Sequence, residues 1–540
     1  MNLILNASKR CRVLPWLSAF ALLVHADAYP AQQTNPLKGF DRYIEQARGE
    51  FGNVGLAVAV VHDDRVVFAQ GFGLRQSGQP ARIGPDTLFQ VGSTTKALAC
   101  ASLGVLVDDG KLRWDDPVVD YLPDFQLRDP WLTRQLTVRD TVTHRSGIVG
   151  APYLVMSVMS ADDVIRQLRY AKPDGAFRDS FQYSNPMYGV AGKVAGAVSG
   201  MSWNEFVRRR LLQPLQMNRS GTSPYEFWDP KFVTSPFQGS APASRPSYTD
   251  ARDADVAMPH VMDDRGQPHV VAWQSYDNAA AAGSIVSSAR EMANWVIVNL
   301  NEGRFAGKQV LSKQTLQALH SVQNLRLEEP FPFQAASEGY AMGWNKVRYR
   351  DRSLLHHGGD LIGFNAYVAL MPEERIGVVV LSNSQQTVGG DNQAFRKAIA
   401  LRAVDQLLNG PSRHWDQEFL ALAKQADATA KTKELKLQSS RLPNAPPSLP
   451  LDRYAGDYED SIQHSGRVSV SIEAGQLSLT FPGAGAFSAV LEHWHGDVFR
   501  LRKKGPGKQS LTGHFMSFVI DPQGAVTSMS LFNETFERLP

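Results

Sequence analysis

Cysteine is almost absent from this chain of 540 residues, which contains two, at positions 11 and 100. Position 11 falls in an N-terminal segment with the pattern of an export signal, so Cys100 remains alone, without a disulfide partner. An exported protein without disulfides must be held together by its core. The hydrophobic fraction of 43% and the length of the chain are sufficient for a large core.

An excess of one charge is missing as well, because 56 Lys and Arg residues face 53 Asp and Glu residues, which gives a net charge of +3. A balanced chain lacks the basic surface with which nucleic-acid-binding proteins attract phosphates, so we expect no nucleic-acid partner. Beyond residue 28 the sequence has no apolar run of about 18 residues, the length that a membrane span requires. We therefore expect no membrane span once the N-terminal segment is removed.

The N-terminus has the three parts of a secretory signal peptide. Basic residues at positions 9–12 precede an apolar run over 13–24, and Ala-Asp-Ala at 26–28 fits a small-residue cleavage site. A buried N-terminal helix is the alternative, but the order and lengths of the three parts favour export. We expect cleavage after Ala28 and a periplasmic or secreted protein.

Periodicity and turn residues over positions 36–410 predict a hairpin, then mostly helices, and then a second pair of strands. The expected strands are 56–61, 65–69, 367–371 and 376–382. The expected helices are 40–51, 94–107, 188–198 and 391–408, together with others between 114 and 221.

The character of the sequence changes after residue 410. A polar helical stretch covers 415–437, and residues 442–450 contain four prolines, which is typical of a stiff linker. The last ninety residues alternate in the manner of short strands separated by glycine-containing turns, which predicts a small barrel or sandwich. The clearest expected strands are 468–472, 477–481, 498–501, 516–520 and 526–532.

Three short motifs carry the chemistry, and the first is an S-x-x-K pattern formed by Ser93 and Lys96 at the start of an expected helix. Residues three apart share a helix face, so the lysine can lie against the serine hydroxyl. That hydroxyl needs a base to become a nucleophile, and a lysine whose pKa is lowered by burial can be that base. In isolation, the pattern is also that of a helix N-cap followed by a solvated lysine.

The second motif is Tyr183-Ser184-Asn185, just before the helix expected over 188–198. A tyrosine hydroxyl within reach of Ser93 can act as base and then as acid, provided that cationic neighbours lower its pKa. Asn185 can bind the lysine or donate to a substrate carbonyl. The alternative is a tyrosine that only packs in a turn.

The third motif is His357-Gly358-Gly359, followed by Asp360. A small residue on an edge strand lets a substrate backbone pair alongside it. The backbone N–H of Asp360 is a candidate oxyanion donor, and His357 can supply a polar or cationic contact. The adjacent His356 also suggests a metal site, but no other group has ligand spacing, so we expect no metal and no cofactor.

In this order, the three motifs resemble those of the serine β-lactamase and penicillin-binding-protein superfamily. An H-x-G third motif in place of K-T-G is similar to the class C β-lactamase-related branch, which includes D-aminopeptidases and esterases. The stretches 136–147 and 282–288 also resemble that branch, and the resemblance covers roughly residues 36–405. The tail, with Tyr-Ala-Gly-Asp-Tyr at 454–458, looks like a lipocalin-like barrel that is appended to some of these hydrolases.

The resemblance implies an α+β fold, in which an antiparallel sheet flanked by helices adjoins an all-helical lobe, followed by a small all-β barrel. The expected regions are a signal peptide (1–28), a β-lactamase-like serine hydrolase domain (36–410), a helical segment with a Pro-rich linker (411–450) and a C-terminal lipocalin-like barrel (451–540). In a relative of this kind the barrel supports oligomerisation, so a homo-oligomer is possible here.

The resemblance also implies a role for each motif residue. Ser93 is the acylated nucleophile, Lys96 its proton partner and Tyr183 the catalytic base and acid. The residues expected to bind and orient substrate are Asn185, His357, Gly359 and Asp360. An imidazole binds a β-lactam carboxylate less well than a lysine, so efficient β-lactamase activity is not expected.

Three hypotheses follow. The first is an exported serine hydrolase that forms an acyl-enzyme on Ser93 with amide or ester substrates, such as peptides that contain D-amino acids. The second is a non-catalytic protein that uses the penicillin-binding fold for binding or scaffolding, and the third places function in the barrel alone. The complete set of Ser93, Lys96, Tyr183 and Asn185 favours catalysis, while the choice between peptidase, esterase and weak β-lactamase stays open.

Overall fold

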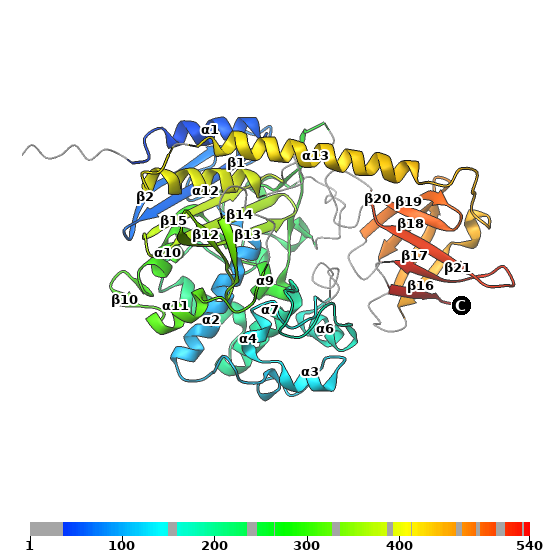
Figure 1. Ribbon diagram of the computed structural model, residues 1–540, viewed down its shortest axis with the longest axis horizontal. Helices are drawn as coiled ribbons and strands as arrows, with labels where there is room; N and C mark the ends of the chain where they lie inside the picture. Colours follow the sequence, from blue (N-terminus) through cyan, green and yellow to red (C-terminus); the bar gives the residue numbers. More distant parts are fainter. Residues whose placement is uncertain are drawn as a thin grey trace, which may run out of the picture.

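The computed structural model describes residues 36–149, 159–234, 246–263, 265–326, 335–385, 393–411, 413–460, 467–481, 487–503, 513–531 and 534–540. The expected signal segment, residues 1–28, lies outside these ranges. In the described part, no helix is long and apolar enough to cross a membrane. Figure 1 shows a large body of sheet and helices joined to a β-barrel by one long helix, α13 (Trp415–Ser439).

The centre of the large body is a seven-stranded antiparallel sheet in which the first two strands of the chain lie beside its later strands. Register pairs such as Val58 with Val380 join β1 to β15, so the sheet connects distant parts of the sequence. In spatial order the strands are β11 (Ala335–Tyr340), β12 (Asn345–Tyr349), β13 (Arg352–Leu361), β14 (Phe364–Met371), β15 (Ile376–Ser382), β1 (Gly55–His62) and β2 (Arg65–Gly73).

Helices cover both faces of this sheet, which explains why β14 and β15 are buried along their whole length. On one face Val378 and Val380 pack with α1 (Phe40–Glu50) and α12 (Ala394–Leu407). On the other face the alternate residue Val379 packs in the cluster that contains α10 (Ala289–Leu300). Strands β14 and β15 and helices α1 and α12 occupy the segments that periodicity predicts.

A helical lobe lies below the sheet in Figure 1 and is centred on α2 (Thr95–Asp108). Every residue of α2 from Thr95 to Leu106 is buried, because other helices enclose it, chiefly α7 (Asn185–Ser199), α9 (Ala280–Gly283) and α11 (Lys313–His320). The other helices of this body are α3 (Pro130–Gln135), α4 (Val138–Thr141), α6 (Ala161–Gln167) and α8 (Trp203–Val207). Short strand pairs are β3 (Phe89–Gln90) with β8 (Val286–Ser287), β4 (Val233–Thr234) with β7 (Trp273–Gln274), β5 (His260–Met262) with β6 (Pro268–Val270), and β9 (Arg304–Phe305) with β10 (Lys308–Gln309).

The C-terminal region is a closed barrel of eight strands. Its strands are β16 (Gly456–Asp460), β17 (Arg467–Glu473), β18 (Gln476–Phe481), β19 (Phe487–His495), β20 (Val498–Lys503), β21 (Phe515–Ile520), β22 (Val526–Leu531) and β23 (Glu534–Arg538). The barrel closes because Tyr458 of β16 pairs with both Val468 and Arg538. Its interior contains a cluster of buried side chains that includes Phe499 and Phe518, so the barrel has its own packed core.

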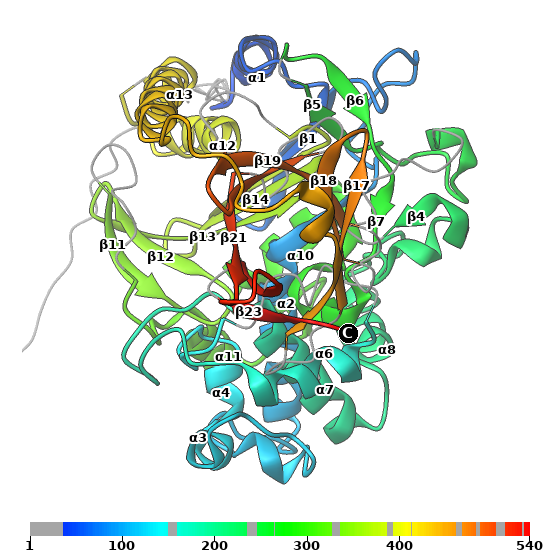
Figure 2. The same cartoon turned by 90° about the vertical axis from the view of Figure 1, so that its right-hand side faces the viewer.

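Both α13 and the Pro-rich segment that follows it form hydrogen bonds with the barrel. The Arg500 guanidinium donates to both carboxylate oxygens of Glu434 on α13, at 2.5 and 2.7 Å. The Arg441 Nε donates to the carbonyl of Trp494, and Gly496 N donates to the carbonyl of Ala445. Helix α13 and the linker therefore connect the barrel to the large body through hydrogen bonds. Figure 2, in which the barrel faces the reader, shows the barrel in front of the sheet.

Candidate active site

Ser93 lies in a 3₁₀ turn (Gly92–Thr94) that leads directly into α2. The turn begins with Gly92 at φ 53°, in the left-handed region that glycine tolerates best. A Cβ on Gly92 would lie 3.2 Å from the backbone N of Asp360 on β13. The lack of a side chain at Gly92 thus lets the serine turn approach β13 closely.

Lys96 is completely buried beside Ser93, as the three-residue spacing predicts. Its Nζ lies 3.1 Å from Ser93 Oγ, 2.7 Å from Asn185 Oδ1 and 2.8 Å from the carbonyl oxygen of Ala282. Burial without a carboxylate partner lowers the pKa of Lys96 well below its usual range, which favours the neutral amine. A neutral amine has two N–H groups, which suit Asn185 and Ala282, and one lone pair, which is left for the Ser93 hydroxyl.

Tyr183 is the third member of this cluster. Its hydroxyl shares a hydrogen bond with Ser93, and its ring lies 4.8 Å from Lys96 Nζ. Burial is the largest effect on this group and raises the pKa of Tyr183 above its usual value, although the bond to Ser93 opposes it. The expected net lowering of the Tyr183 pKa is therefore not found, because burial outweighs both the bond to Ser93 and the positive charge of Arg326.

Asn185 is the first residue of α7, three residues before the helix start that periodicity predicts. The helix begins earlier because the Ser184 hydroxyl accepts from the backbone N of Met187 and Pro186 occupies the first turn. This cap places the Asn185 side chain at the end of the helix, facing Lys96.

His144 is a residue whose contribution the sequence alone does not reveal. Its Nδ1 accepts a hydrogen bond from the backbone N of Ser184 at 3.0 Å, and its ring lies 4.2 Å from the ring of Tyr183. His144 is buried and adopts φ 55°, a strained conformation for a non-glycine residue. His144 therefore positions Ser184 through this hydrogen bond and packs against the ring of Tyr183.

Replacing His144 by phenylalanine should lower kcat/KM by roughly tenfold to a hundredfold, because the buried Ser184 N–H loses its acceptor while the ring volume is kept. The matched control is His320→Phe, which removes a partly buried histidine from α11, far from the motifs in the sequence. Steady-state kinetics together with thermal unfolding separates the effects. Equal loss of stability in both variants with unchanged kcat/KM in His144→Phe would show that His144 does not position Tyr183.

The H-x-G motif lies on β13, which is an interior strand rather than the expected edge strand. Residues 352–356 pair with β12, whereas residues 357–361 pair with β14 alone. Since β12 begins at Asn345, opposite His356, no strand among the described residues pairs with the second half of β13 on that side. A substrate backbone can pair with that half of the strand. The expectation of an edge strand is therefore wrong for β13 as a whole, because its first half pairs with β12.

Gly359 is required by a close approach of the backbone. A Cβ at this position would lie 2.0 Å from the carbonyl oxygen of Val91 and 3.1 Å from the backbone N of Ser93. No side chain fits there without moving the serine turn. The glycine thus allows β13 to approach the serine turn closely, and such an approach is needed if the backbone N–H groups of Ser93 and Asp360 are to form one oxyanion hole.

We expect Gly359→Ala to lower kcat/KM at least about tenfold and to destabilise the fold by about 1–3 kcal/mol, as overpacking does. Gly358→Ala is the matched control, because a Cβ there meets only the end of the flexible Gln393 side chain, at 3.1 Å. Kinetics and denaturant unfolding of both variants test this difference. Full activity of Gly359→Ala would contradict the account of this strand.

Asp360 takes part through its backbone, because its side chain is bound elsewhere. The Asp360 carboxylate accepts from Asn365 Nδ2 at 2.9 Å and from Arg396 Nη2 at 2.7 Å. Arg396 is fully buried and also donates to the carbonyls of Gly359 and Ala366, at 2.9 and 2.5 Å. Nothing in the sequence of α12 distinguishes Arg396 as functional, yet its hydrogen bonds fix the backbone of the motif.

His357 is buried behind the cluster, with Nε2 3.3 Å from Tyr340 Oη and Nδ1 2.6 Å from the carbonyl of Gly358. Burial, the largest effect, lowers the pKa of His357 to about 3. The imidazole is therefore neutral and supplies a polar contact, not a cationic one. In the part of the chain that the structure describes, no three His, Cys, Asp or Glu side chains are grouped for a metal ion.

The comparisons with known proteins agree with this architecture. Residues 40–402 match the family model named Beta-lactamase, and residues 440–539 match one described as a domain of unknown function, DUF3471. Because the first match covers more than half of the chain, this protein belongs to the β-lactamase family. The resemblance to penicillin-binding proteins and the barrel expected at the C-terminus are both confirmed.

Among its relatives, the protein named unguisins hydrolase ungD of Aspergillus violaceofuscus is 27% identical, over 93% of this chain and 89% of that one. Protein flp of Staphylococcus aureus is 22% identical, over 61% of this chain and 59% of that one. The solved structure of the octameric penicillin-binding protein homologue from Pyrococcus abyssi has a TM-score of 0.58 at 21% identity, over 93% of this chain and 99% of that one. The SurE structure has a TM-score of 0.53 at 21% identity, with the same coverage, and both likenesses show the fold.

Proposed function

We propose that the protein is a serine hydrolase that forms an acyl-enzyme on Ser93 with amide or ester substrates. The observation that carries this proposal is the bonding of Lys96, whose buried amine has two fixed acceptors and a third neighbour, the Ser93 hydroxyl, at 3.1 Å. A solvated lysine after a helix cap needs no such arrangement. The same arrangement makes the non-catalytic alternative the less favoured one.

In the first step, Lys96 accepts the proton of Ser93 as Oγ attacks the carbonyl carbon of the substrate. The oxygen that becomes negative is bound by the backbone N–H groups of Ser93 and Asp360. Tyr183 then gives its hydroxyl proton to the leaving nitrogen or oxygen and recovers one from the Lys96 ammonium. Water, deprotonated by the same pair of residues, releases the acid from Ser93 and restores the resting site.

Two observations support a substrate class: the His357 imidazole is neutral, and two similar proteins have names that mention unguisins or D-Leu. His357 carries no charge to attract a β-lactam carboxylate, so efficient β-lactamase activity is not part of the proposal. One relative is named a hydrolase of unguisins, and one structural neighbour is titled SurE with D-Leu. These names make peptides with D-amino acids the first substrates to test, beside simple esters.

We further propose that residues 1–28 are removed on export to the periplasm or exterior, and that the barrel supports a homo-oligomer. The apolar run over 13–24 supports export. The octameric structural neighbour, which spans the barrel as well, supports an assembly of several copies.

The proposed function is tested with a panel of chromogenic substrates: a p-nitrophenyl ester and matched D- and L-aminoacyl p-nitroanilides. We expect the wild type to hydrolyse at least one of them and Ser93→Ala to hydrolyse none above background. Preference for the D-anilide indicates a peptidase of D-residues, and hydrolysis of the ester alone indicates an esterase. No hydrolysis by folded wild type would favour the binding or scaffolding role.

A further inference from the structure

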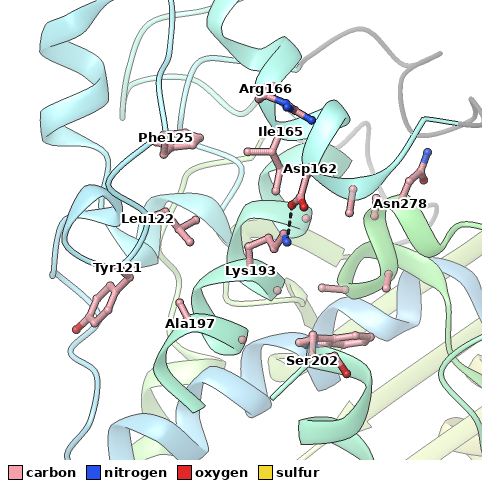
Figure 3. A pocket seen from close by; sticks show the side chains of 18 of the residues that line it. Tyr121, Leu122, Phe125, Asp162, Ile165, Arg166, Lys193, Ala197, Ser202 and Asn278 are labelled. Carbon is pink, nitrogen blue, oxygen red and sulfur yellow. Dashed lines mark ion pairs between the residues drawn. The ribbon is translucent and has the colours of Figure 1, made fainter. Parts of the chain in front are cut away.

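A cavity of about 830 Å³ lies in the helical lobe, and none of the motif residues lines it. Figure 3 shows its walls, which come from the loop at 121–126, α6, α7 and the segments 200–204 and 277–281. Its volume is within the range of pockets that bind small molecules. It is therefore distinct from the catalytic cluster.

Most of the lining is apolar or small. Leu122, Phe125 and Ile165 lie on one side of the cavity in Figure 3, and Ala197 of α7 faces them. The glycines at 189, 192 and 196 have no side chains, so α7 leaves room for the cavity along the same wall. Such a surface suits the apolar body of a ligand.

Two of the basic lining residues are paired with carboxylates, and a third, an arginine, is not. Lys193 forms an ion pair with Asp162 across the cavity, and Arg166 forms one with Asp163. Arg169 also lines the cavity, and within the described part of the chain its Nε–H is buried and has no acceptor. Arg169 itself is partly exposed. A partly exposed guanidinium whose buried Nε–H lacks an acceptor favours an anionic group in the cavity.

The acidic lining residues do not supply that acceptor. Asp277 accepts a hydrogen bond from Ser223 at 2.6 Å, and burial raises the pKa of Asp277 to about 6. Asp124 is exposed to solvent. A ligand carboxylate can therefore reach Arg169 without displacing an existing partner.

We propose that this cavity binds a small molecule with an apolar body and one carboxylate, which pairs with Arg169. The site goes beyond the proposed hydrolysis and is independent of it. Its occupant would touch both elements that hold Lys96, because Gly189 lies one turn after Asn185 on α7. Residues 279–281 directly precede Ala282, whose carbonyl accepts from Lys96.

The test uses Ser93→Ala protein, so that binding is measured without turnover. Isothermal titration calorimetry with decanoate should show saturable binding of one molecule per chain, whereas decylammonium, with the same chain and the opposite charge, should not bind. Arg169→Gln should weaken decanoate binding by about tenfold or more. The control Arg134→Gln, an exposed arginine on α3, should leave binding unchanged.

A second pair of variants locates the ligand. Ala197→Phe should fill the cavity and abolish binding, while Ala197→Ser should retain it. Circular dichroism and thermal unfolding establish that Ala197→Phe is folded. Absence of saturable decanoate binding, unchanged affinity in Arg169→Gln, or binding of decylammonium with similar affinity would each overturn the proposal. None of these results depends on whether Ser93 is a nucleophile.

Discussion

Ser93→Ala should lower kcat/KM by at least about a thousandfold on whichever ester or amide the wild type hydrolyses. The loss is large because the hydroxyl forms the covalent bond, and the remaining groups can only bind substrate and polarise its carbonyl. Removing one Oγ from the half-buried turn leaves the helix and its packing in place. Steady-state kinetics with a chromogenic ester measures the effect directly.

The matched control is Ser102→Ala, which removes a buried hydroxyl from the same helix. Ser102 Oγ donates to the carbonyl of Ala99 and accepts from Trp203 Nε1, so its loss affects packing and not chemistry. That variant should keep kcat/KM within a few fold of the wild type. Comparable losses in the two variants would mean that damage to α2, and not loss of a nucleophile, explains the result at Ser93.

Lys96→Met should be nearly as severe, with a loss of about a thousandfold that falls mainly on kcat. Methionine keeps the length and apolar stem of the side chain but has no lone pair to take the serine proton. Lys96→Arg should not restore activity, because a guanidinium stays protonated and cannot act as a base. Lys111→Met, at an exposed lysine, is the control and should be neutral.

The pH dependence identifies the protonation state that catalysis needs. Because burial lowers the pKa of Lys96, the neutral and active form is present above that lowered pKa and is lost as the pH falls through it. Activity of the wild type should therefore decline on the acid side, and that limb should disappear from the residual activity of Lys96→Met. A Lys96→Met enzyme within tenfold of the wild type, with the acid limb intact, would place the base elsewhere, with Tyr183 as the next candidate.

The sequence predicts the pairs of groups that are close along the chain. Ser93 and Lys96 meet because three residues make nearly one helical turn, and the hairpin at 56–69 follows from alternation and its turn. Most strands of the sheet and five of the eight barrel strands are predicted in the same way. What brings these elements together is long-range pairing, such as β1 with β15, which a single sequence leaves open.

The parts that the sequence does not reveal depend on burial and on backbone contacts across the fold. The pKa of Tyr183 depends on how completely its hydroxyl is enclosed, and no local pattern records that enclosure. Arg396 and His144 act by bonding to backbone groups of distant motifs. The sequence also does not reveal that β13 lies inside the sheet, nor that β12 begins opposite His356 and so, among the described residues, pairs with only the first half of β13.

The central claim is that Ser93 becomes covalently acylated, and intact-mass spectrometry tests it most directly. Wild type and Ser93→Ala are each treated with a fluorophosphonate and, separately, with a penicillin, and the modified peptide is then mapped. We predict one fluorophosphonate adduct per chain on Ser93 of the wild type and no adduct on Ser93→Ala. A lasting penicillin adduct as well would point to D-peptide or cell-wall substrates. An unmodified wild type that is demonstrably folded, or an adduct that persists in Ser93→Ala, would contradict the account.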